Sequence, residues 1–221
     1  MANPLRKLLR PKSAADFTAR IVAKGEIKTA LDIGCGTYSH LQAFRPELET
    51  TGLDAFIDAI DTAKKRGVHD NYIHADILKD QIDTQFDLVT LYGLIEHIPK
   101  TDGIKLLDRI EKLSRKYIIF ETPNGFVPQG PEFGNEFQRH RSGWNIHEFE
   151  NRGYQVYGTT GTRYLRGYMA GPKHNLPGSI FFDELLTLFL QINNNPKHAF
   201  NLVAIKDVRG VSAIHKKGDQ P

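Results

Sequence analysis

Hydrophobic residues follow two different spacings along the chain. Short apolar runs such as "TALDIG" and "KYIIFETP" have the length and composition of buried strands, whereas "DGIKLLDRIEKL" places Ile104, Leu107, Ile110 and Leu113 at helical spacing. The alternation predicts strands over 29–34, 50–56, 71–77, 86–95, 116–123, 154–160 and 200–208. It predicts helices near 15–25, directly after Ser39, and over 57–67, 102–113, 145–152 and 180–193.

Strands that alternate with helices need crossover connections, and these favour a parallel sheet with helices on both faces. The pattern therefore predicts a doubly wound α/β fold with a mostly parallel, seven-stranded sheet. An insertion of about forty residues, 163–199, separates the last two strands. Its helix over 180–193 carries more apolar residues than one face needs, so we expect it to pack against the domain, with a lid or a homodimer contact as alternatives.

Composition restricts the class of protein further. A chain of 221 residues with 40% hydrophobic residues suits one compact domain. The single cysteine, Cys35, excludes an internal disulfide framework, and we expect a cytoplasmic protein. The longest apolar stretch is interrupted by Asp183 and Glu184, so we expect no membrane span.

The net charge of +3 predicts only a weak attraction to nucleic acid. Basic residues gather locally at two places, near the N-terminus (Arg6, Lys7, Arg10 and Lys12) and at "RHR", 139–141.

The segment "LDIGCG" ends the first predicted strand at Gly34 and Gly36, where the backbone can approach a ligand closely. Asp54 ends the second strand twenty residues after Gly34, at a position where a carboxylate can accept hydrogen bonds from both hydroxyls of an adenosine ribose. A dinucleotide fingerprint would need a third glycine where this chain has Ser39. The spacing therefore favours another adenosine-bearing cofactor over a nicotinamide dinucleotide.

The motifs "LDIGCGT", "GLDAF", "HADI" and "FDLVTLYGLIEHIP" together resemble those of class I S-adenosylmethionine-dependent methyltransferases. The resemblance covers residues 28–160 and implies a Rossmann-like methyltransferase fold whose last strand is antiparallel. It implies that Asp54 holds the ribose of S-adenosyl-L-methionine, that Asp76 and Ile77 bracket the adenine, and that Asp32 lies under the methionine part. The full set of cofactor-binding residues that it implies is Asp32, Gly34, Cys35, Gly36, Asp54, Ala55, Asp76, Ile77, Tyr92 and Gly93.

The chain departs from the family at Tyr38, which stands where the motif usually has a third glycine. The aromatic ring must point away from the cofactor or replace one of its contacts. This departure bears on the pose of the methionine tail more than on the identity of the cofactor.

Two later segments supply candidate residues for the methyl acceptor. His140 and His97 are the candidate catalytic bases, because histidine titrates near neutral pH. Glu96, Arg139, Arg141 and Trp144 are the candidate substrate residues, although for Trp144 we favour a core position under the loop over stacking on a substrate. A solvated basic turn is the alternative for the arginines. Glu121 and Asn124 make at most a partial magnesium site, so we predict no metal.

The chain is thus expected to be a methyltransferase (EC 2.1.1.-) that modifies a hydroxyl or amine of a small-molecule or glycan-like acceptor. The alternatives are an RNA-modifying methyltransferase and a non-catalytic adenosine-binding module. We expect an N-terminal helical extension over 1–27, a methyltransferase domain over 28–208 and a tail over 209–221.

Overall fold

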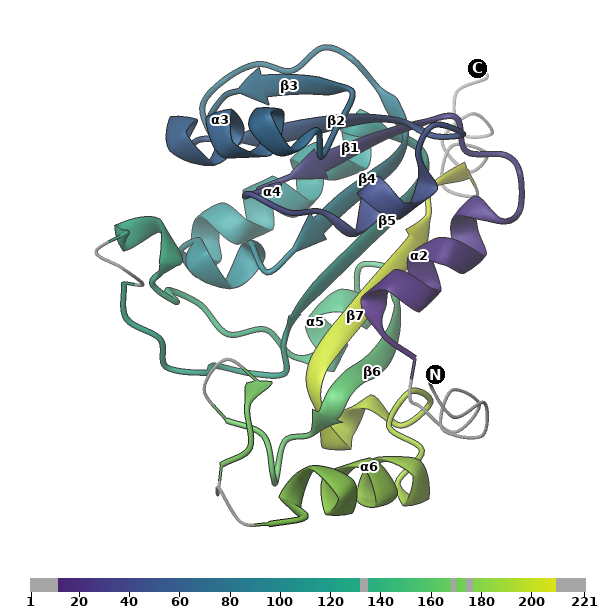
Figure 1. Cartoon of the computed structure of the whole chain (residues 1–221), viewed down its shortest axis with the longest axis vertical. Coiled ribbons are helices and arrows are strands. Elements are labelled where there is room, and N and C mark those ends of the chain that lie inside the picture. Colours follow the sequence, from purple (N-terminus) through teal and green to yellow (C-terminus); the bar gives the residue numbers. More distant parts are fainter. Residues whose placement is uncertain (1–11, 132–134, 168–169, 174–176, 210–221) are drawn as a thin grey trace, which may run out of the picture.

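A computed structural model describes residues 12–131, 135–167, 170–173 and 177–209 (Figure 1). Of the N-terminal basic cluster, Arg6, Lys7 and Arg10 lie outside these ranges, as does the predicted tail from residue 210. The strands are β1 (Thr29–Ile33), β2 (Glu49–Asp54), β3 (Asn71–His74), β4 (Phe86–Tyr92), β5 (Ser114–Pro123), β6 (Gln155–Thr162) and β7 (Ala199–Asp207). The α-helices are α2 (Ala14–Val22), α3 (Ile57–Arg66), α4 (Lys100–Leu113), α5 (Ile146–Glu150) and α6 (Ser179–Phe189). Short 3₁₀ helices are η1 (His40–Phe44), η2 (Ile95–His97), η3 (Glu136–Gln138) and η5 (Pro196–His198).

The seven strands form one sheet in the order β3-β2-β1-β4-β5-β7-β6. The pairs among β1 to β5 are parallel, and β7 runs antiparallel to both β5 and β6. The predicted mostly parallel, doubly wound α/β fold is confirmed. The strand order reverses between β1 and β4, which is where ligands bind in such sheets.

Side chains alternate along the strands to build a separate core on each face of the sheet. On one face Leu31 and Ile33 of β1 join residues of α4 and α5, and on the other Ala30 joins residues of α2. Figure 1 shows α2 in front of the sheet and α4 behind it. This arrangement follows from the two-residue period of a strand, which sends neighbouring side chains to opposite faces.

Capping side chains mark the point where α5 begins. Asn145 accepts from the backbone N–H of Glu148, whose carboxylate accepts from the N–H of Asn145, so a capping box starts α5.

Helix α4 buries Leu107 and Ile110 as predicted. Ile104 is exposed, because the buried face of this helix runs through Gly103 and Leu106 instead.

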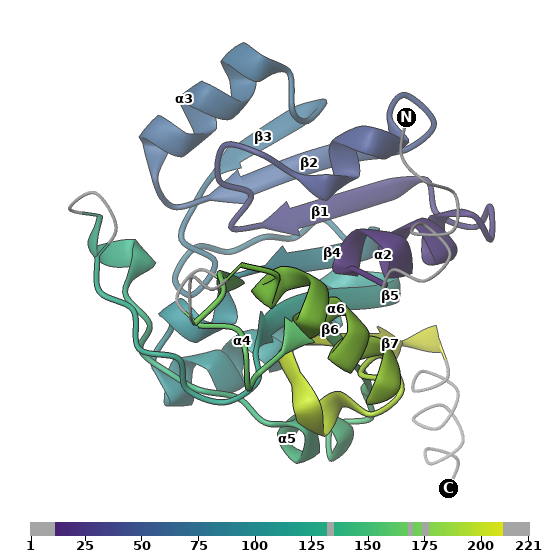
Figure 2. The same cartoon turned by 60° about the horizontal axis from the view of Figure 1, so that its bottom comes forward.

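Helix α6 corrects the expectation that its apolar residues pack against the domain. Phe181 and Phe189 are 70% and 82% exposed, whereas Asp183 and Thr187 are buried. The reason is that Asp183 accepts hydrogen bonds from Thr162 and Arg166, which holds the polar face of the helix inward. Figure 2 shows α6 beside β6. Within the described residues, none of the helices combines the length and apolar character that a bilayer span requires.

Candidate functional site

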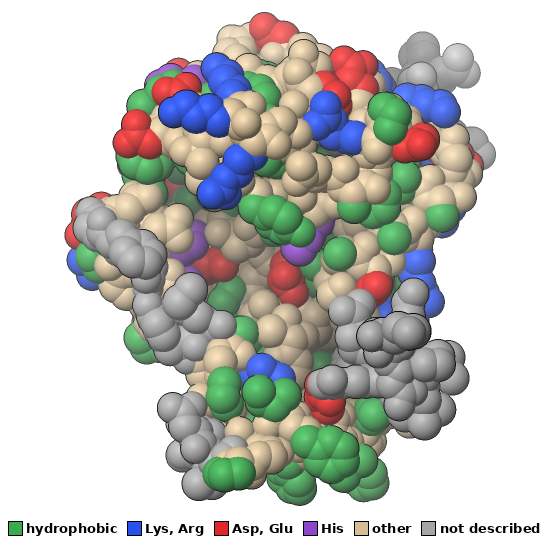
Figure 3. Space-filling model, in the orientation of Figure 1, with side chains coloured by type: hydrophobic (Ala, Val, Ile, Leu, Met, Phe, Trp, Pro, Cys, Tyr) green, Lys and Arg blue, Asp and Glu red, His purple; other side chains and the backbone are tan. Residues whose placement is uncertain are grey.

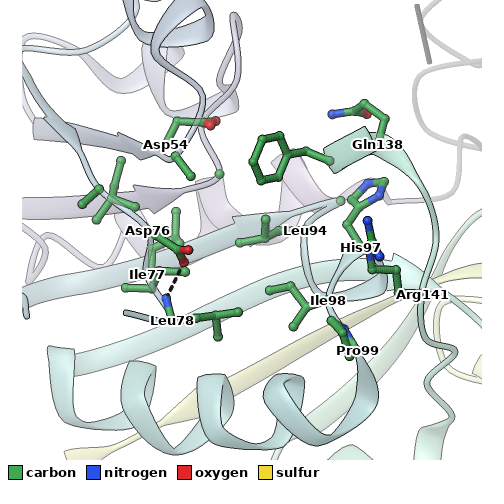
Figure 4. A pocket seen from close by; sticks show the side chains of 17 residues that line it. Asp54, Asp76, Ile77, Leu78, Leu94, His97, Ile98, Pro99, Gln138 and Arg141 are labelled. Carbon is green, nitrogen blue, oxygen red and sulfur yellow. Dashed lines mark hydrogen bonds between the residues drawn. The ribbon is translucent and has the colours of Figure 1, made fainter. Parts of the chain in front are cut away.

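A pocket of about 300 Å³ opens at the carboxyl ends of β1, β2 and β4, in the hollow at the middle of Figure 3. Figure 4 shows Asp54 and Asp76 on one side of it and His97, Gln138 and Arg141 on the other, with Leu94 between them. The volume is at the lower end of the range for small-molecule sites. The lining consists of Ile33, Gly34, Leu53, Asp54, Ala55, Ala75, Asp76, Ile77, Leu78, Gly93, Leu94, His97, Ile98, Pro99, Phe137, Gln138 and Arg141.

The glycine turn after β1 forms the floor of this pocket. Gly34 has a φ of 70°, a conformation that side chains disfavour, and its N–H donates to the carbonyl of Leu53 at 2.7 Å. A Cβ on Gly34 would lie 2.9 Å from Cδ1 of Leu94. Glycine is therefore needed here both for the turn and for the space beneath Leu94.

Asp54, at the end of β2, is held rigidly by backbone donors. Its Oδ2 accepts from the N–H of Gly36 at 2.9 Å, and its Oδ1 accepts from the N–H of Phe56 at 2.8 Å. Each carboxylate oxygen keeps a further lone pair, and the side chain lines the pocket. A pair of vicinal hydroxyls fits this arrangement.

Asp76 is fixed by its own local contacts after β3. Its Oδ1 accepts from the N–H of Leu78 at 2.9 Å, the dashed line in Figure 4, and its Oδ2 lies 2.7 Å from Nζ of Lys79. Burial acts to raise the pKa of Asp76, but the Lys79 ammonium and the Leu78 N–H outweigh it and lower the pKa below its usual range. Beside it, Ile77 and Leu78 supply the apolar surface that a planar purine needs.

Asp32 lies beneath the turn and does not line the pocket. Its carboxylate accepts from Ser39 Oγ at 2.5 Å and from Thr90 Oγ1 at 2.6 Å. Burial raises its pKa to about 6. Asp32 thus supports the turn from below.

The opposite wall forms where the loop after β5 is attached to η2. The backbone N–H groups of Arg141 and Ser142 both donate to the carbonyl of Glu96, at 2.7 and 3.0 Å. Ser142 Oγ also donates to the carbonyl of Ile95. These contacts bring the "RHR" segment beside "IEH".

Glu96, His97 and His140 meet at this attachment. One carboxylate oxygen and one nitrogen from each ring all lie within 4.8 Å of one another. Burial raises the pKa of Glu96 to about 7, and burial together with the neighbouring His140 lowers the pKa of His97 to about 4. Burial lowers the pKa of His140 as well. Two neutral imidazoles therefore face a buried carboxyl group.

The arrangement of glycine turn and strand-end acids agrees with the family comparison. A family model described as "Methyltransferase domain" matches residues 6–161. The chain belongs to this methyltransferase family. The membership confirms the resemblance to class I S-adenosylmethionine-dependent methyltransferases and S-adenosylmethionine as the cofactor. The rigid Asp54 carboxylate and the side-chain-free turn at Gly34 fit that cofactor.

Solved structures agree on the fold of the methyltransferase. N-methyltransferase NodS from Bradyrhizobium japonicum WM9 is 15% identical with a TM-score of 0.55, covering 87% of each chain. The plantazolicin methyltransferase BpumL is 22% identical with a TM-score of 0.52, covering 91% of this chain and 83% of its own. A SAM-dependent methyltransferase from Archaeoglobus fulgidus is 19% identical with a TM-score of 0.53, covering 88% and 94%. No curated protein matches the sequence significantly.

Several residues that the sequence assigns to the site of the methyltransferase lie elsewhere. Trp144 is 2% exposed, stacks on Phe149 and donates to Ser142, so it packs in the core instead of facing an acceptor. The Tyr92 hydroxyl is hydrogen-bonded to Thr18 of α2 and the side chain is not part of the lining. Further residues of the predicted site outside the pocket lining are Asp32, Cys35, Gly36, Glu96, Arg139 and His140.

Sequence reasoning missed most of the apolar lining of the methyltransferase pocket. Leu94, Ile98 and Pro99 lie between the polar residues that it selected in "YGLIEHIP", and Phe137 and Gln138 precede "RHR". In the sequence, apolar residues at these positions cannot be told from ordinary core residues. The one available sign that they line the pocket was that polar residues already assigned to the site lie next to them in the same motifs.

Proposed function

We propose that this methyltransferase transfers the methyl group of S-adenosylmethionine to a hydroxyl or amine of a small-molecule or glycan-like acceptor. The observation that carries the proposal is the position of the Asp54 carboxylate. Each of its two oxygens accepts a hydrogen bond from a backbone N–H, and the side chain lines the pocket together with Gly34. When bound, the cofactor supplies an electrophilic methyl group on a positively charged sulfur. The protein then has to bind, orient and exclude water.

The two sides of the pocket would divide these tasks. Asp54 would accept hydrogen bonds from the ribose hydroxyls, and Ile77 and Leu78 would cover the adenine. Leu94 lies against Gly34 and shields the centre of the pocket, while His97 and Arg141 border the side from which an acceptor enters. This division favours an acceptor that binds at the attachment between η2 and the loop after β5.

The charges of that loop favour a compact acceptor over RNA. Arg139 donates from Nε and Nη2 to the two carboxylate oxygens of Glu136, and Arg141 Nη2 lies 3.8 Å from one of them. The two arginines therefore share one acid within their own loop, which reduces the positive field available to a phosphate backbone.

Thermal unfolding tests the cofactor assignment. S-adenosylhomocysteine should raise the melting temperature of the full chain by several degrees, because a ligand that binds only the folded state stabilises it. Asp54→Ala should abolish the rise, since each lost charged hydrogen bond is worth about 1.5–3 kcal/mol. Asp61→Ala, which removes an exposed acid of α3, is the matched control and should keep the full rise. Stabilisation by NADH instead would overturn the proposal.

Methyl transfer into a fractionated extract tests the acceptor. Labelled methyl from S-adenosylmethionine should enter a small-molecule fraction, and Asp54→Ala should remove the label. Label in the RNA fraction, with binding that weakens steeply as salt increases, would support the RNA alternative. A protein that binds S-adenosylhomocysteine but labels no fraction would be a non-catalytic module.

A further inference from the structure

We propose that Glu96, His97 and His140 bind a divalent first-row transition cation at the acceptor side of the pocket. The three side chains come from η2 and from the loop after β5, and their candidate ligand atoms all lie within 4.8 Å of one another. Two imidazoles and one carboxylate are a known ligand set for catalytic zinc and for other divalent ions with an open coordination position.

Each of the two histidines has its Nδ1 at a backbone carbonyl. His140 Nδ1 lies 2.6 Å from the carbonyl of Val127, and His97 Nδ1 lies 3.3 Å from the carbonyl of Arg139. A backbone carbonyl accepts a proton, so in the tautomer that satisfies these bonds Nδ1 carries the hydrogen and Nε2 carries the lone pair. Metal-binding histidines commonly donate their other ring N–H to such a carbonyl. The ring centroids are 4.8 Å apart with the planes at 67°.

Glu96 provides a second and independent observation. The side chain is 5% exposed, and its Oε2 accepts from Thr122 Oγ1 at 3.1 Å. Among the described residues no lysine or arginine forms an ion pair with it, although the charged form of a buried carboxylate is costly without a compensating charge. A bound cation would supply that charge.

The position of the site suggests what the cation does, and this part rests on the proposed function. His97 lines the pocket, and the carboxylate of Glu96 approaches Gly93, which also lines it. An acceptor oxygen or nitrogen entering from this side could occupy the open coordination position. The cation would then orient the acceptor and lower the pKa of its hydroxyl, and the histidines would act as ligands instead of the general bases that the sequence predicts.

The proposed ligands differ from those considered in the prediction that no metal binds. That prediction looks for carboxylates at the ends of strands β4 and β5, the ligands that magnesium prefers. Imidazole nitrogens instead suit zinc, cobalt and related ions. The histidines lie on segments that only the folded chain brings together.

Cobalt binding tests the site without any methyl transfer. Full-length, tag-free protein is treated with a chelator and titrated with Co²⁺, and visible ligand-field absorption and calorimetry are recorded. One equivalent should bind, and His140→Ala and Glu96→Gln should each weaken binding by more than about 100-fold, since even residues behind metal ligands matter 10–100-fold. His147→Ala, which removes an exposed histidine of α5, should leave binding unchanged.

The same proteins are tested for stabilisation by S-adenosylhomocysteine, which keeps the two proposals separate. Absence of Co²⁺ binding, or equal binding by wild type, His140→Ala and Glu96→Gln, would overturn the metal site whether or not the cofactor binds. Co²⁺ binding that depends on these residues would support it, even if the cofactor assignment failed. Variants that keep the S-adenosylhomocysteine shift are folded, so their loss of Co²⁺ can be attributed to the ligands.

Discussion

The two sides of the pocket are built in different ways: the proposed cofactor side carries Asp54 and Asp76, and the proposed acceptor side carries His97 and Arg141. On the cofactor side, Asp54 is held by hydrogen bonds from residues 2 and 18 positions away in the sequence. On the acceptor side, His97 meets the carbonyl of a residue 42 positions away, and Glu96 is reached by the same distant loop. The cofactor side therefore depends on strand ends of the sheet. The acceptor side depends on how one loop is attached.

The two sides also differ in the groups that stabilise their acidic side chains. The acids that line the cofactor side are neutralised by backbone N–H groups or by Lys79. Glu96 on the acceptor side has a hydroxyl partner and two neutral imidazoles. Loops carried by a rigid scaffold vary more than the scaffold itself, so the loop side of the pocket is the side suited to a variable binding partner.

The largest effect is expected from Trp144→Ala, which removes the anchor of the acceptor-side loop. The indole stacks on Phe149, lies 3.6 Å from Nζ of Lys100 and fills the space above Gly103. Large-to-small changes of a buried Trp cost about 3–5 kcal/mol of unfolding free energy. Urea denaturation measures the loss.

Phe137→Ala is the control for Trp144→Ala, because Phe137 belongs to the same loop and is 60% exposed. It should change the unfolding free energy by less than about 0.5 kcal/mol. A cost below about 1 kcal/mol for Trp144→Ala would mean that the loop is attached mainly by its backbone hydrogen bonds to Glu96.

The contrast explains how much the sequence could predict. Gly34, Asp54 and Asp76 each follow an apolar strand, so the parallel fold alone brings them to one edge of the sheet. The meeting of Glu96 with His140 could not be predicted, because it depends on the course of an irregular loop. The exposure of Phe181 was missed for a similar reason: only the tertiary contacts of Asp183 decide which face of α6 turns inward.

A second prediction concerns the buried acid beneath the turn. The folded-state pKa of Asp32 is raised to about 6 from an ordinary 3.8, so the folded state binds more protons between these values and its stability falls as pH rises. Asp32→Asn removes this cost. The unfolding free energy of Asp32→Asn minus that of wild type should therefore increase from pH 4 to pH 6, by up to about 3 kcal/mol.

Urea denaturation at a series of pH values measures the difference curve for Asp32. Ser39, Thr90, His69 and Asp54 surround the carboxylate and are present in both proteins, so the difference curve isolates the change at Asp32. A flat curve for Asp32→Asn would show that neighbouring groups compensate the buried charge of Asp32.

A third prediction separates backbone strain from crowding in the glycine turn. Gly34 and Gly36 both have positive φ, but a Cβ on Gly36 would meet nothing within 4 Å, whereas one on Gly34 would reach Leu94. Both alanine variants should lose about 1–2 kcal/mol from the backbone. Gly34→Ala should lose more, and it should bind S-adenosylhomocysteine more weakly by calorimetry.

The double variant Gly34→Ala/Leu94→Ala completes this test. Removing the Leu94 side chain should cancel the crowding, so the two changes should cost less together than the sum of the single changes. Strict additivity would contradict a contact between the two sides of the pocket at this point.

The smallest effect is expected from Tyr38→Ala, at the position where the family motif usually has glycine. The Tyr38 side chain is 65% exposed, lies edge-on to His40 with ring centroids 5.6 Å apart and is not part of the pocket lining. Its removal should change S-adenosylhomocysteine affinity by less than about 3-fold. Ser39→Ala, next to it, deletes the donor to Asp32 and should cost about 1–3 kcal/mol of stability. A loss of affinity beyond about 10-fold for Tyr38→Ala would mean that the ring turns inward and replaces a backbone contact, and the cofactor side would then depend on a side chain of its loop just as the acceptor side does.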